Sequence, residues 1–148
     1  MKNTFGSALC LTIFGESHGA GVGAVLDGMA AGVPVDPAAL AALMDKRRAR
    51  GDGLSTARVE ADEVRILSGV VNGRTTGTPL TLLIENHNTR SGDYAATAAL
   101  LRPGHADYTA YARYRGWQDA RGGGHFSGRI TAGLVAGGGV VLLSLIHI

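Results

Sequence analysis

The chain is 148 residues long and 45% hydrophobic, which suits one folded domain and excludes an intrinsically disordered protein. Its formal net charge is only +2, and basic residues are not interleaved with aromatic ones, which disfavours a nucleic-acid-binding module. All but two of its 14 cationic residues are arginine, whose planar group matches carboxylate and phosphate. The composition therefore favours a small anionic molecule as the partner.

A single cysteine, Cys10, excludes a disulfide bond within the chain. Its place inside an apolar run is typical of a small core residue. The first residues lack the basic and apolar regions of a signal peptide, and no apolar run approaches the length of a membrane span. We therefore expect a cytoplasmic protein without a membrane partner.

Four segments have the character of β-strands. Residues 9–14 and 21–28 are apolar runs bounded by glycines, which predicts a hairpin. Residues 63–70 alternate between apolar and polar side chains, which predicts a strand with one exposed face, and residues 78–85 predict a further strand. Between these two strands, Asn72-Gly73 is a strong turn signal. Strands in hairpin order combined with helices predict an α+β fold built on antiparallel sheets.

Three helices are expected. Asp36 predicts a helix start because Asp is a favoured N-cap and a proline follows it, and Gly51 predicts the end of this helix. Residues 106–114 place tyrosines on one helical face, against which Trp117 is expected to pack. Ser127 is a candidate N-cap for the last helix.

Two features near the C-terminal end are unusual. Gly137-Gly138-Gly139 makes a poor helix interior. Residues 143–148 match the translation of a common transposon-derived sequencing adaptor. We therefore expect residues 1–142 to be the native part of the chain and residues 143–148 to be a non-native tail.

Three loops each contain a histidine among glycines. They span residues 15–19, 102–107 and 121–129. The first follows a buried strand and contains Glu16, Ser17 and His18, and such polar residues are costly to place there unless they face a cleft. We predict that the three loops converge on one anion-binding active site.

Other sites were weighed against this prediction. The G-x-S-x-G pattern at residues 15–19 also occurs in serine hydrolases, but their nucleophile turn requires a helix directly after it, and a strand-like segment follows here. Residues 19–23 lack the spacing of a dinucleotide-binding loop. The histidines and the cysteine lack zinc-ligand spacing, so no metal site is predicted. A serine hydrolase stays a remote alternative.

His18 and His105 are the candidate general acids, because each lies in a short glycine-containing loop near arginine or carboxylate. Glu16 is a candidate to orient His18, and Asp107 to orient His105. The glycines at 122–124 present consecutive backbone N–H groups before a helix, an arrangement that binds phosphate.

The chain resembles the N-terminal part of the chorismate synthases. Seven segments carry the resemblance, in the family's order: Phe14-Gly15-Glu16-Ser17-His18-Gly19, Leu67-Ser68-Gly69-Val70, Thr75-Thr76-Gly77-Thr78, Leu83-Ile84-Glu85-Asn86, Arg90-Ser91-Gly92-Asp93-Tyr94, Arg102-Pro103-Gly104-His105-Ala106-Asp107 and Arg121-Gly122-Gly123-Gly124. Such a set is far more specific than any one of its motifs.

The resemblance implies the last step of the shikimate pathway, which supplies aromatic amino acid biosynthesis. In that step 5-enolpyruvylshikimate 3-phosphate loses phosphate and a ring hydrogen by anti-1,4-elimination to give chorismate. The family requires reduced FMN, for which NADPH is a candidate electron source, although the reaction has no net redox change. The family's fold places helices between antiparallel sheets, and its members are homotetramers.

The resemblance also implies roles for individual residues. The proton-handling histidines correspond to His18 and His105. The substrate-binding positions correspond to Ser17, Arg47, Arg48, Arg102 and Arg129. The flavin-contacting segment corresponds to Gly124, His125, Phe126 and Ser127.

The chains of this family are more than twice as long as 148 residues. We therefore expect residues 1–142 to form the N-terminal part of a single chorismate synthase domain, with an incomplete sandwich and no activity alone. The alternative is a non-catalytic anion-binding or aggregating fragment, since unpaired strand edges and an apolar tail favour association.

Overall fold

The computed structural model describes residues 2–49, 61–87, 94 and 100–145. Expectations that fall elsewhere, such as the loop at residues 51–57 and the motif at residues 90–93, lie outside the described residues. The elements, in chain order, are β1 (Thr4–Phe5), β2 (Cys10–Gly15), β3 (Gly21–Asp27), α1 (Pro37–Arg47), β4 (Arg65–Ser68), β5 (Val70–Val71), β6 (Arg74–Thr75), β7 (Leu80–Glu85), α2 (Asp107–Tyr114), the 3₁₀ turns η2 (Gly124–Phe126) and η3 (Gly128–Ile130), and α3 (Thr131–Leu145).

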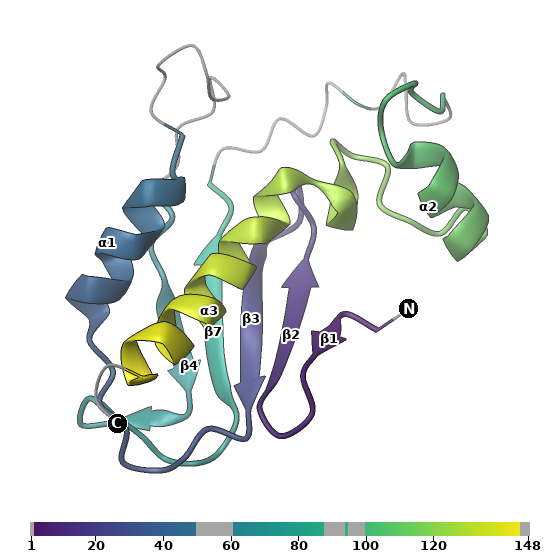
Figure 1. Cartoon of the computed structure of the whole chain (residues 1–148). Helices are drawn as coiled ribbons and strands as arrows, with labels where there is room; N and C mark the ends of the chain where they lie inside the picture. Colours follow the sequence, from purple (N-terminus) through teal and green to yellow (C-terminus); the bar gives the residue numbers. More distant parts are fainter. Residues whose placement is uncertain (1, 50–60, 88–93, 95–99, 146–148) are drawn as a thin grey trace.

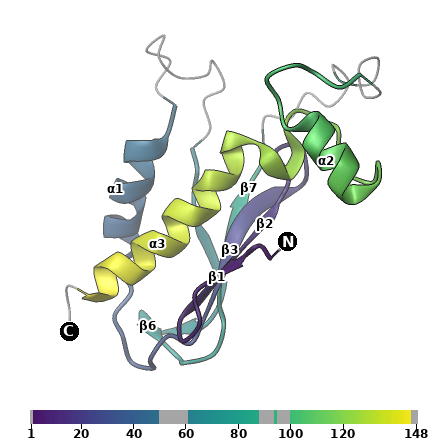
Figure 2. The same ribbon diagram turned by 45° about the vertical axis from the view of Figure 1, so that its right-hand side comes forward.

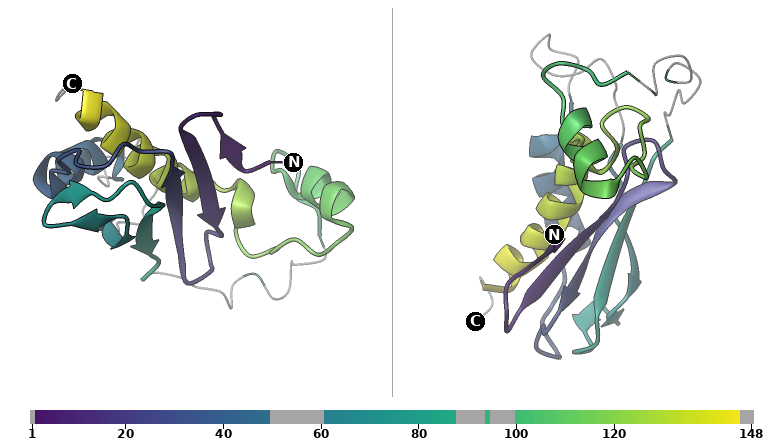
Figure 3. Two further views of the ribbon diagram at one scale, coloured as in Figure 1. Left: turned by 90° about the horizontal axis from the view of Figure 1, so that it is seen from below. Right: turned by 90° about the vertical axis from the view of Figure 1, so that its right-hand side faces the viewer.

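A five-stranded antiparallel sheet is the frame of the molecule, with the strand order β1-β2-β3-β7-β4. Helix α3 runs obliquely across one face of this sheet, and α1 lies beside it (Figure 1). Seen edge-on, both helices lie on the same side of the strands (Figure 3). The α+β class and the β2–β3 hairpin are confirmed, and the described residues form one sheet-and-helix half of the expected sandwich.

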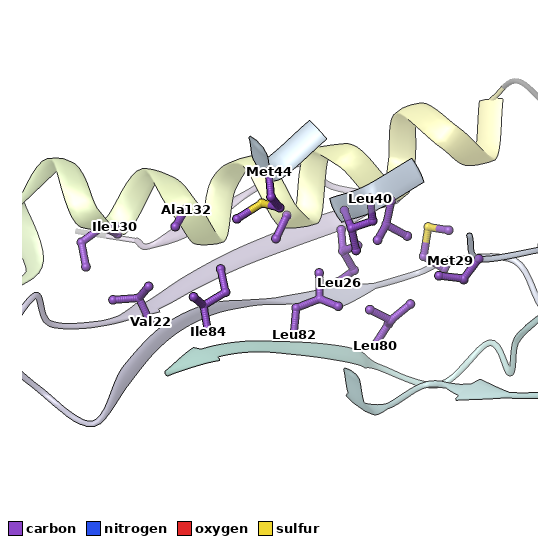
Figure 4. Packing of buried hydrophobic residues seen from close by; sticks show 13 residues of the cluster. Val22, Leu26, Met29, Leu40, Met44, Leu80, Leu82, Ile84, Ile130 and Ala132 are labelled. Carbon is purple, nitrogen blue, oxygen red and sulfur yellow. The ribbon is translucent and has the colours of Figure 1, made fainter. Parts of the chain in front are cut away.

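The core lies between this sheet and the two helices. Alternate residues of β3 and β7 point toward the helices and are almost completely buried, as the period-two pattern requires. From the helix side, Leu40 and Met44 of α1 and Ala132 of α3 close the layer (Figure 4). The largest fully buried side chains are Val22, Leu26, Leu80, Leu82 and Ile84.

Helix α1 begins as the sequence predicts. The Asp36 carboxylate accepts hydrogen bonds from the backbone N–H groups of Ala38 and Ala39, at 2.9 and 3.1 Å, which satisfies two donors of the first turn. The helix ends at Arg47, earlier than the predicted stop at Gly51, which lies outside the described residues. This end places Arg47 at the edge of the candidate site.

The strand predicted over residues 63–70 is divided in two. β4 ends at Ser68, and Val70 belongs instead to the separate β5–β6 hairpin. Gly69 causes the break because its φ is +82°, and a Cβ there would lie 2.5 Å from the Cα of Leu80. The Asn-Gly turn is confirmed, since Asn72 and Gly73 connect β5 to β6.

The expectation that the glycine triplet disfavours a helix interior is wrong, because α3 continues through it to Leu145. A Cβ on Gly137 would lie 2.5 Å from Leu11, and one on Gly139 would lie 2.9 Å from Leu40. The glycines therefore let α3 approach the sheet on one side and α1 on the other (Figure 2). Close packing offsets the low intrinsic helix propensity of glycine.

The segment Gly128–Leu145 is long and apolar enough to cross a membrane by length and composition, contrary to the sequence prediction that no such run exists. However, 44% of this segment is buried inside the molecule, where it packs on β3 and α1 as a core helix. Residues 143–145 continue α3, and 146–148 lie outside the described residues. The non-native tail stays a prediction, to be tested by sequencing the locus through codon 143.

Helix α2 forms over Asp107–Tyr114, close to the predicted bounds, but its tyrosines do not form a packed face. Tyr108 and Tyr111 are 70% and 52% exposed, and Ala110 is the buried residue of the helix. Trp117 is 90% exposed, so the prediction that it packs on this helix is wrong. Cys10 is also only half-buried, because it alternates with the core residue Leu11 and points away from the helices.

Candidate functional site

The loop between β2 and β3, called here the His18 loop (residues 15–20), is held by distant parts of the chain. Asn86, directly after β7, donates from its side-chain amide to the carbonyls of Glu16 and Gly19, both at 3.0 Å. The Ser17 N–H donates to the Gly124 carbonyl at 3.1 Å. The loop is therefore held by one partner from the predicted segment 121–129 and by Asn86, which the sequence analysis did not place at the site.

His18 is enclosed on three sides. Its Nδ1 lies 3.0 Å from the hydroxyl of Ser17, a residue that is only 3% exposed. Its ring makes an edge contact with Tyr94, with centroids 4.9 Å apart. On a third side the ring packs against the backbone of Gly122, where an added Cβ would lie 2.5 Å from Cε1. The Glu16 carboxylate lies beside Gly19, and the Ser17 hydroxyl is within hydrogen-bond distance of Nδ1.

Arg102 is joined to the same place. It makes a two-pronged ion pair with Asp107, with Nε–Oδ2 at 2.8 Å and Nη2–Oδ1 at 3.0 Å, and it donates to the carbonyl of Gly122. This guanidinium lowers the pKa of Asp107 to about 2. The Arg102 guanidinium also lies 6.0 Å from the ring centroid of Tyr94. Arg102 and His18 therefore share Gly122 and Tyr94 as neighbours.

The expected role of Asp107 differs from its observed contacts. Its carboxylate is engaged by Arg102, while His105 is exposed and its Nδ1 faces the carbonyl of Pro103 at 3.4 Å. A carboxylate with a bidentate arginine partner has its favoured acceptor sites occupied. Asp107 therefore orients Arg102 in this structure, and the prediction that it orients His105 is corrected.

A second group, called here the arginine cluster, consists of Arg47, Asp62 and Arg129. Both guanidiniums donate to the Asp62 carboxylate, whose side chain is only 2% exposed. Arg129 also donates from Nε to the Asn86 Oδ1 at 3.0 Å and from Nη2 to the Glu85 carbonyl at 3.3 Å. The cluster has two positive charges and one negative charge, so it carries a net positive charge beside the His18 loop.

Arg48 stands apart from this cluster. It forms an i,i+3 ion pair with Asp45 at 3.0 Å, in which the two side chains are 38% and 58% exposed. Exposed pairs of this kind contribute little to stability. Within the described residues, Arg48 contacts neither Asp62 nor the His18 loop through any hydrogen bond or ion pair.

His125 and Phe126 line a cavity of about 430 Å³ beside β2. The Nδ1 of His125 donates to the Gly15 carbonyl at 2.7 Å, which joins the cavity to the His18 loop. Aromatic residues border much of this cavity, and the buried Oε1 atom of Gln118, a lining residue, has no hydrogen-bond partner among the described residues. The lining consists of Asn3, Thr12, Ile13, Phe14, Gly15, Glu16, Tyr114, Trp117, Gln118, Asp119, His125 and Phe126.

The glycine segment before α3 forms a tight turn. The N–H of Gly124 donates to the Arg121 carbonyl at 3.1 Å, so this donor closes the turn and does not face a ligand. Ser127 caps the helical run as predicted, since its Oγ accepts from the Arg129 N–H at 3.2 Å, although the run starts with the 3₁₀ turn η3. Gly124 and Ser127 are absent from the described lining of the cavity.

One alternative from the sequence is resolved by this geometry. Ser17 is followed by strand β3, without the helix that a hydrolase nucleophile turn requires, so the serine hydrolase alternative is wrong. Across the described ranges, no group of three or more His, Cys, Asp or Glu side chains is arranged to hold a metal ion. The side chain of His87 is 74% exposed and lies on the surface.

The structure is an antiparallel α+β scaffold that brings a histidine loop close to arginine–carboxylate groups, and guanidinium groups match carboxylate and phosphate in geometry and charge. Residues 9–147 match the family model described as chorismate synthase. The chain therefore belongs to the chorismate synthase family.

Relatives agree with this assignment. The chain is 52% identical over 136 residues to a chorismate synthase of Desulfovibrio desulfuricans, covering 92% of this chain and 37% of the relative. It is 45% identical over 150 residues to that of Dehalococcoides mccartyi, covering 100% and 41%. A crystal structure of a chorismate synthase matches with a TM-score of 0.67 and 29% identity, over 95% of this chain and 34% of that one. The chain spans about two fifths of the length of these relatives.

Sequence reasoning missed two residues of the site. Asn86 was noted only as the end of a motif, although its position directly after a strand is a signal that polar side chains there face the sheet edge. Asp62 gave no signal, because it is one carboxylate among several polar residues with no periodic pattern around it. Its burial is visible only in three dimensions.

Proposed function

We propose that this chain, when extended to the full length of its relatives, catalyses the elimination of phosphate from 5-enolpyruvylshikimate 3-phosphate to give chorismate. In this reaction a C–O bond to phosphate and a ring C–H bond break, a C=C bond forms, and no net oxidation occurs. The observation that supports the proposal is the pair of contacts around the His18 loop, on a scaffold of the chorismate synthase family: Gly122 contacts both His18 and Arg102, and Asn86 joins the loop backbone to Arg129.

His18 is the proposed proton donor at the phosphate end. In the tautomer in which Nδ1 accepts a hydrogen bond from the Ser17 hydroxyl, the neutral ring carries its proton on Nε2, on the opposite side of the imidazole. That N–H can protonate a departing phosphate, whose developing charge preorganised cations stabilise. His105 is the second proposed proton-handling residue, and its exposure leaves it accessible to a ligand.

Arg47, Arg102 and Arg129 are the proposed anion-binding residues near this acid, with Ser17 supporting His18. A substrate with two carboxylates and a phosphate requires several cations within hydrogen-bond reach. The ion pairs of these arginines with Asp62 and Asp107 fix their positions before substrate arrives, which favours catalysis. Arg48 is a proposed peripheral cation, since its partner Asp45 lies on the surface.

Reduced FMN is the proposed cofactor, with NADPH as its proposed source of electrons. The cavity lined by aromatic residues fits a planar heterocycle in size and in the character of its lining. The Gln118 Oε1, which has no hydrogen-bond partner among the described residues, is a suitable acceptor for an N–H group of such a ring. His125 and Phe126 would hold this group, while Gly124 and Ser127 shape the turn that carries them. When bound, reduced FMN would supply transient electron donation, the chemistry that assists the departure of phosphate.

The decisive experiment is anaerobic turnover of 5-enolpyruvylshikimate 3-phosphate with reduced FMN. It compares the 148-residue chain with the same gene carried to the full length of its relatives. Chorismate from the longer protein alone supports both the function and the inactivity of the shorter chain. The absence of chorismate and of flavin binding from both proteins contradicts the proposal. We propose that the complete protein is a cytoplasmic homotetramer, which gel filtration and light scattering would test.

The exposed leucines of α3 favour self-association of the 148-residue chain when it is alone. Helix α3 exposes Leu134, Leu142 and Leu145, which are 44%, 52% and 63% accessible. Apolar groups gathered along one helix favour association. We propose that the isolated chain self-associates, and a monodisperse monomer at high concentration in light scattering would contradict this proposal.

A further inference from the structure

We propose that Asp62 is a positioning residue of the anion site, a role that rests on the proposed function of Arg47 and Arg129. Its carboxylate receives one guanidinium from the end of α1 and another from the turn before α3. These two segments are far apart in the sequence, and a hydrogen bond of 3.3 Å from the Arg47 Nε to the Thr131 hydroxyl joins them here as well. Asp62 therefore determines the separation of the two cations.

The burial of Asp62 requires this pairing. Its side chain is 2% exposed, and a buried carboxylate without cationic partners is strongly unfavourable. The backbone of Asp62 has a φ of +50°, in the left-handed region that non-glycine residues rarely adopt. Such a conformation persists only where the surroundings determine it. The left-handed backbone conformation of Asp62 therefore accompanies the placement of its carboxylate between the two arginines.

The two arginines use their hydrogen-bonding groups differently. Arg129 is 8% exposed and is fastened by Asp62, Asn86 and the Glu85 carbonyl. Arg47 is 22% exposed, and it donates from Nη1 to Asp62 and from Nε to the Thr131 hydroxyl at 3.3 Å. Its Nη2 makes no hydrogen bond to any residue that the structure describes. We assign this Nη2 group to the anion.

Asn86 connects this arrangement to the acid. Its Oδ1 accepts from Arg129, while its Nδ2 donates to two carbonyls of the His18 loop. A displacement of Arg129 is therefore transmitted to the backbone that carries His18. Asp62 fixes both the anion-binding arginine and, through Arg129 and Asn86, the position of the proton donor.

The substitution Asp62→Asn separates positioning from simple charge. It raises the net charge of the cluster by one, so Coulomb attraction alone predicts tighter binding of inorganic phosphate. Positioning predicts the opposite, because an amide keeps one oxygen and replaces the other with an NH₂ donor, so one of the two guanidiniums loses its acceptor and moves away. We expect binding about tenfold weaker than in the wild-type chain, as for a lost hydrogen bond between charged groups.

Asp45→Asn is the matched control. It removes a carboxylate from the same end of α1 and adds the same charge, but Asp45 is 58% exposed and pairs only with Arg48 among the described residues. Calorimetric or ³¹P NMR titration with phosphate should show wild-type or slightly tighter binding for this variant. Equal or tighter binding in Asp62→Asn than in Asp45→Asn overturns the positioning role and leaves the anion site intact. No phosphate binding by the wild-type chain overturns the anion site itself.

A second measurement does not depend on the folding of the variant. In the wild-type chain, the ¹³Cγ signal of Asp62 should shift on titration with phosphate. The anion competes with the Asp62 carboxylate for the guanidinium of Arg47, and this changes the hydrogen bonds that the carboxylate accepts. A purely structural carboxylate would not respond. An unchanged signal in a titration that reaches saturation overturns the proposal.

Discussion

The substitution Gly122→Ala should displace His18. An added Cβ would lie 2.5 Å from Cε1 and 2.6 Å from Nδ1 of the imidazole, and 3.0 Å from the Ser17 hydroxyl oxygen. Ordinary contacts of this kind exceed about 3.4 Å, so the ring must move by roughly 1 Å or rotate away. The ring can move more easily than the backbone, and its movement breaks the contact with Ser17.

The cost of this change has two parts. Gly122 has a φ of +59°, and a non-glycine residue in this region costs about 1–2 kcal/mol. Loss of the Ser17–His18 hydrogen bond adds about 1 kcal/mol. We expect a destabilisation of roughly 2–3 kcal/mol in urea unfolding. In NMR spectra of the folded variant, the ¹H–¹³C signal of His18 Cε1 should shift.

Gly73→Ala is the control, because Gly73 has a φ of +73° but nothing within 4 Å of an added Cβ. It should lose about 1–2 kcal/mol from the backbone alone and leave the His18 signal unchanged. If the two variants lose the same stability and both keep the wild-type His18 signal, the packing of Gly122 against the imidazole is refuted.

Three further predictions follow from the fold. Leu82→Ala removes a completely buried side chain and should lower the free energy of unfolding by about 2–5 kcal/mol. Leu142 is 52% exposed, so Leu142→Ala should change this free energy by less than about 0.5 kcal/mol. Equal effects of the two variants in urea unfolding would contradict the assigned core. Gly138→Ala should stabilise the chain by about 0.5–1 kcal/mol, because an added Cβ there meets nothing within 4 Å and alanine favours a helix. Gly133→Ala should destabilise the chain, because its Cβ would lie 2.4 Å from the Gly23 carbonyl oxygen. Thermal unfolding of the two variants measures both effects. The hydrogen bonds from Arg102 lower the pKa of Asp107 from 3.8 to about 2. The ion pair therefore stabilises the fold above pH 4, and this stabilisation is lost as the pH falls toward 2. A carboxyl ¹³C titration of Asp107 with a midpoint near 4 would contradict the pairing with Arg102.

The parts of the fold that sequence reasoning reached are those with local causes. The β2–β3 hairpin and the cap at Asp36 follow from alternation, turn glycines and a side chain that bonds its own helix. The division at Gly69 was missed because its cause is the approach of Leu80, eleven residues later. The continuation of α3 through its glycines was missed for the same reason, since propensity is local and packing on Leu11 and Leu40 is not.

The candidate site shows the same limit. The convergence of His18 with Arg102 and the glycine turn was anticipated from three similar loops. The partner of Asp107 was not, because two neighbours at short range, Arg102 and His105, compete for one carboxylate, and the guanidinium offers two parallel donors. Asp62 could not be found without knowing which arginines meet in space.

The fastening of the His18 loop has a consequence for the order of events during synthesis. Its partners are Asn86, about 70 residues later in the chain, and His125, 110 residues after Gly15. A ribosome therefore releases His18 long before the groups that shape its loop exist. The hairpin β2–β3 can pair early, but His18, the proposed acid, acquires its orientation only after the segment through Arg129 has emerged. The shape of the His18 loop is thus fixed late in synthesis, after the chain around it has already paired as a hairpin.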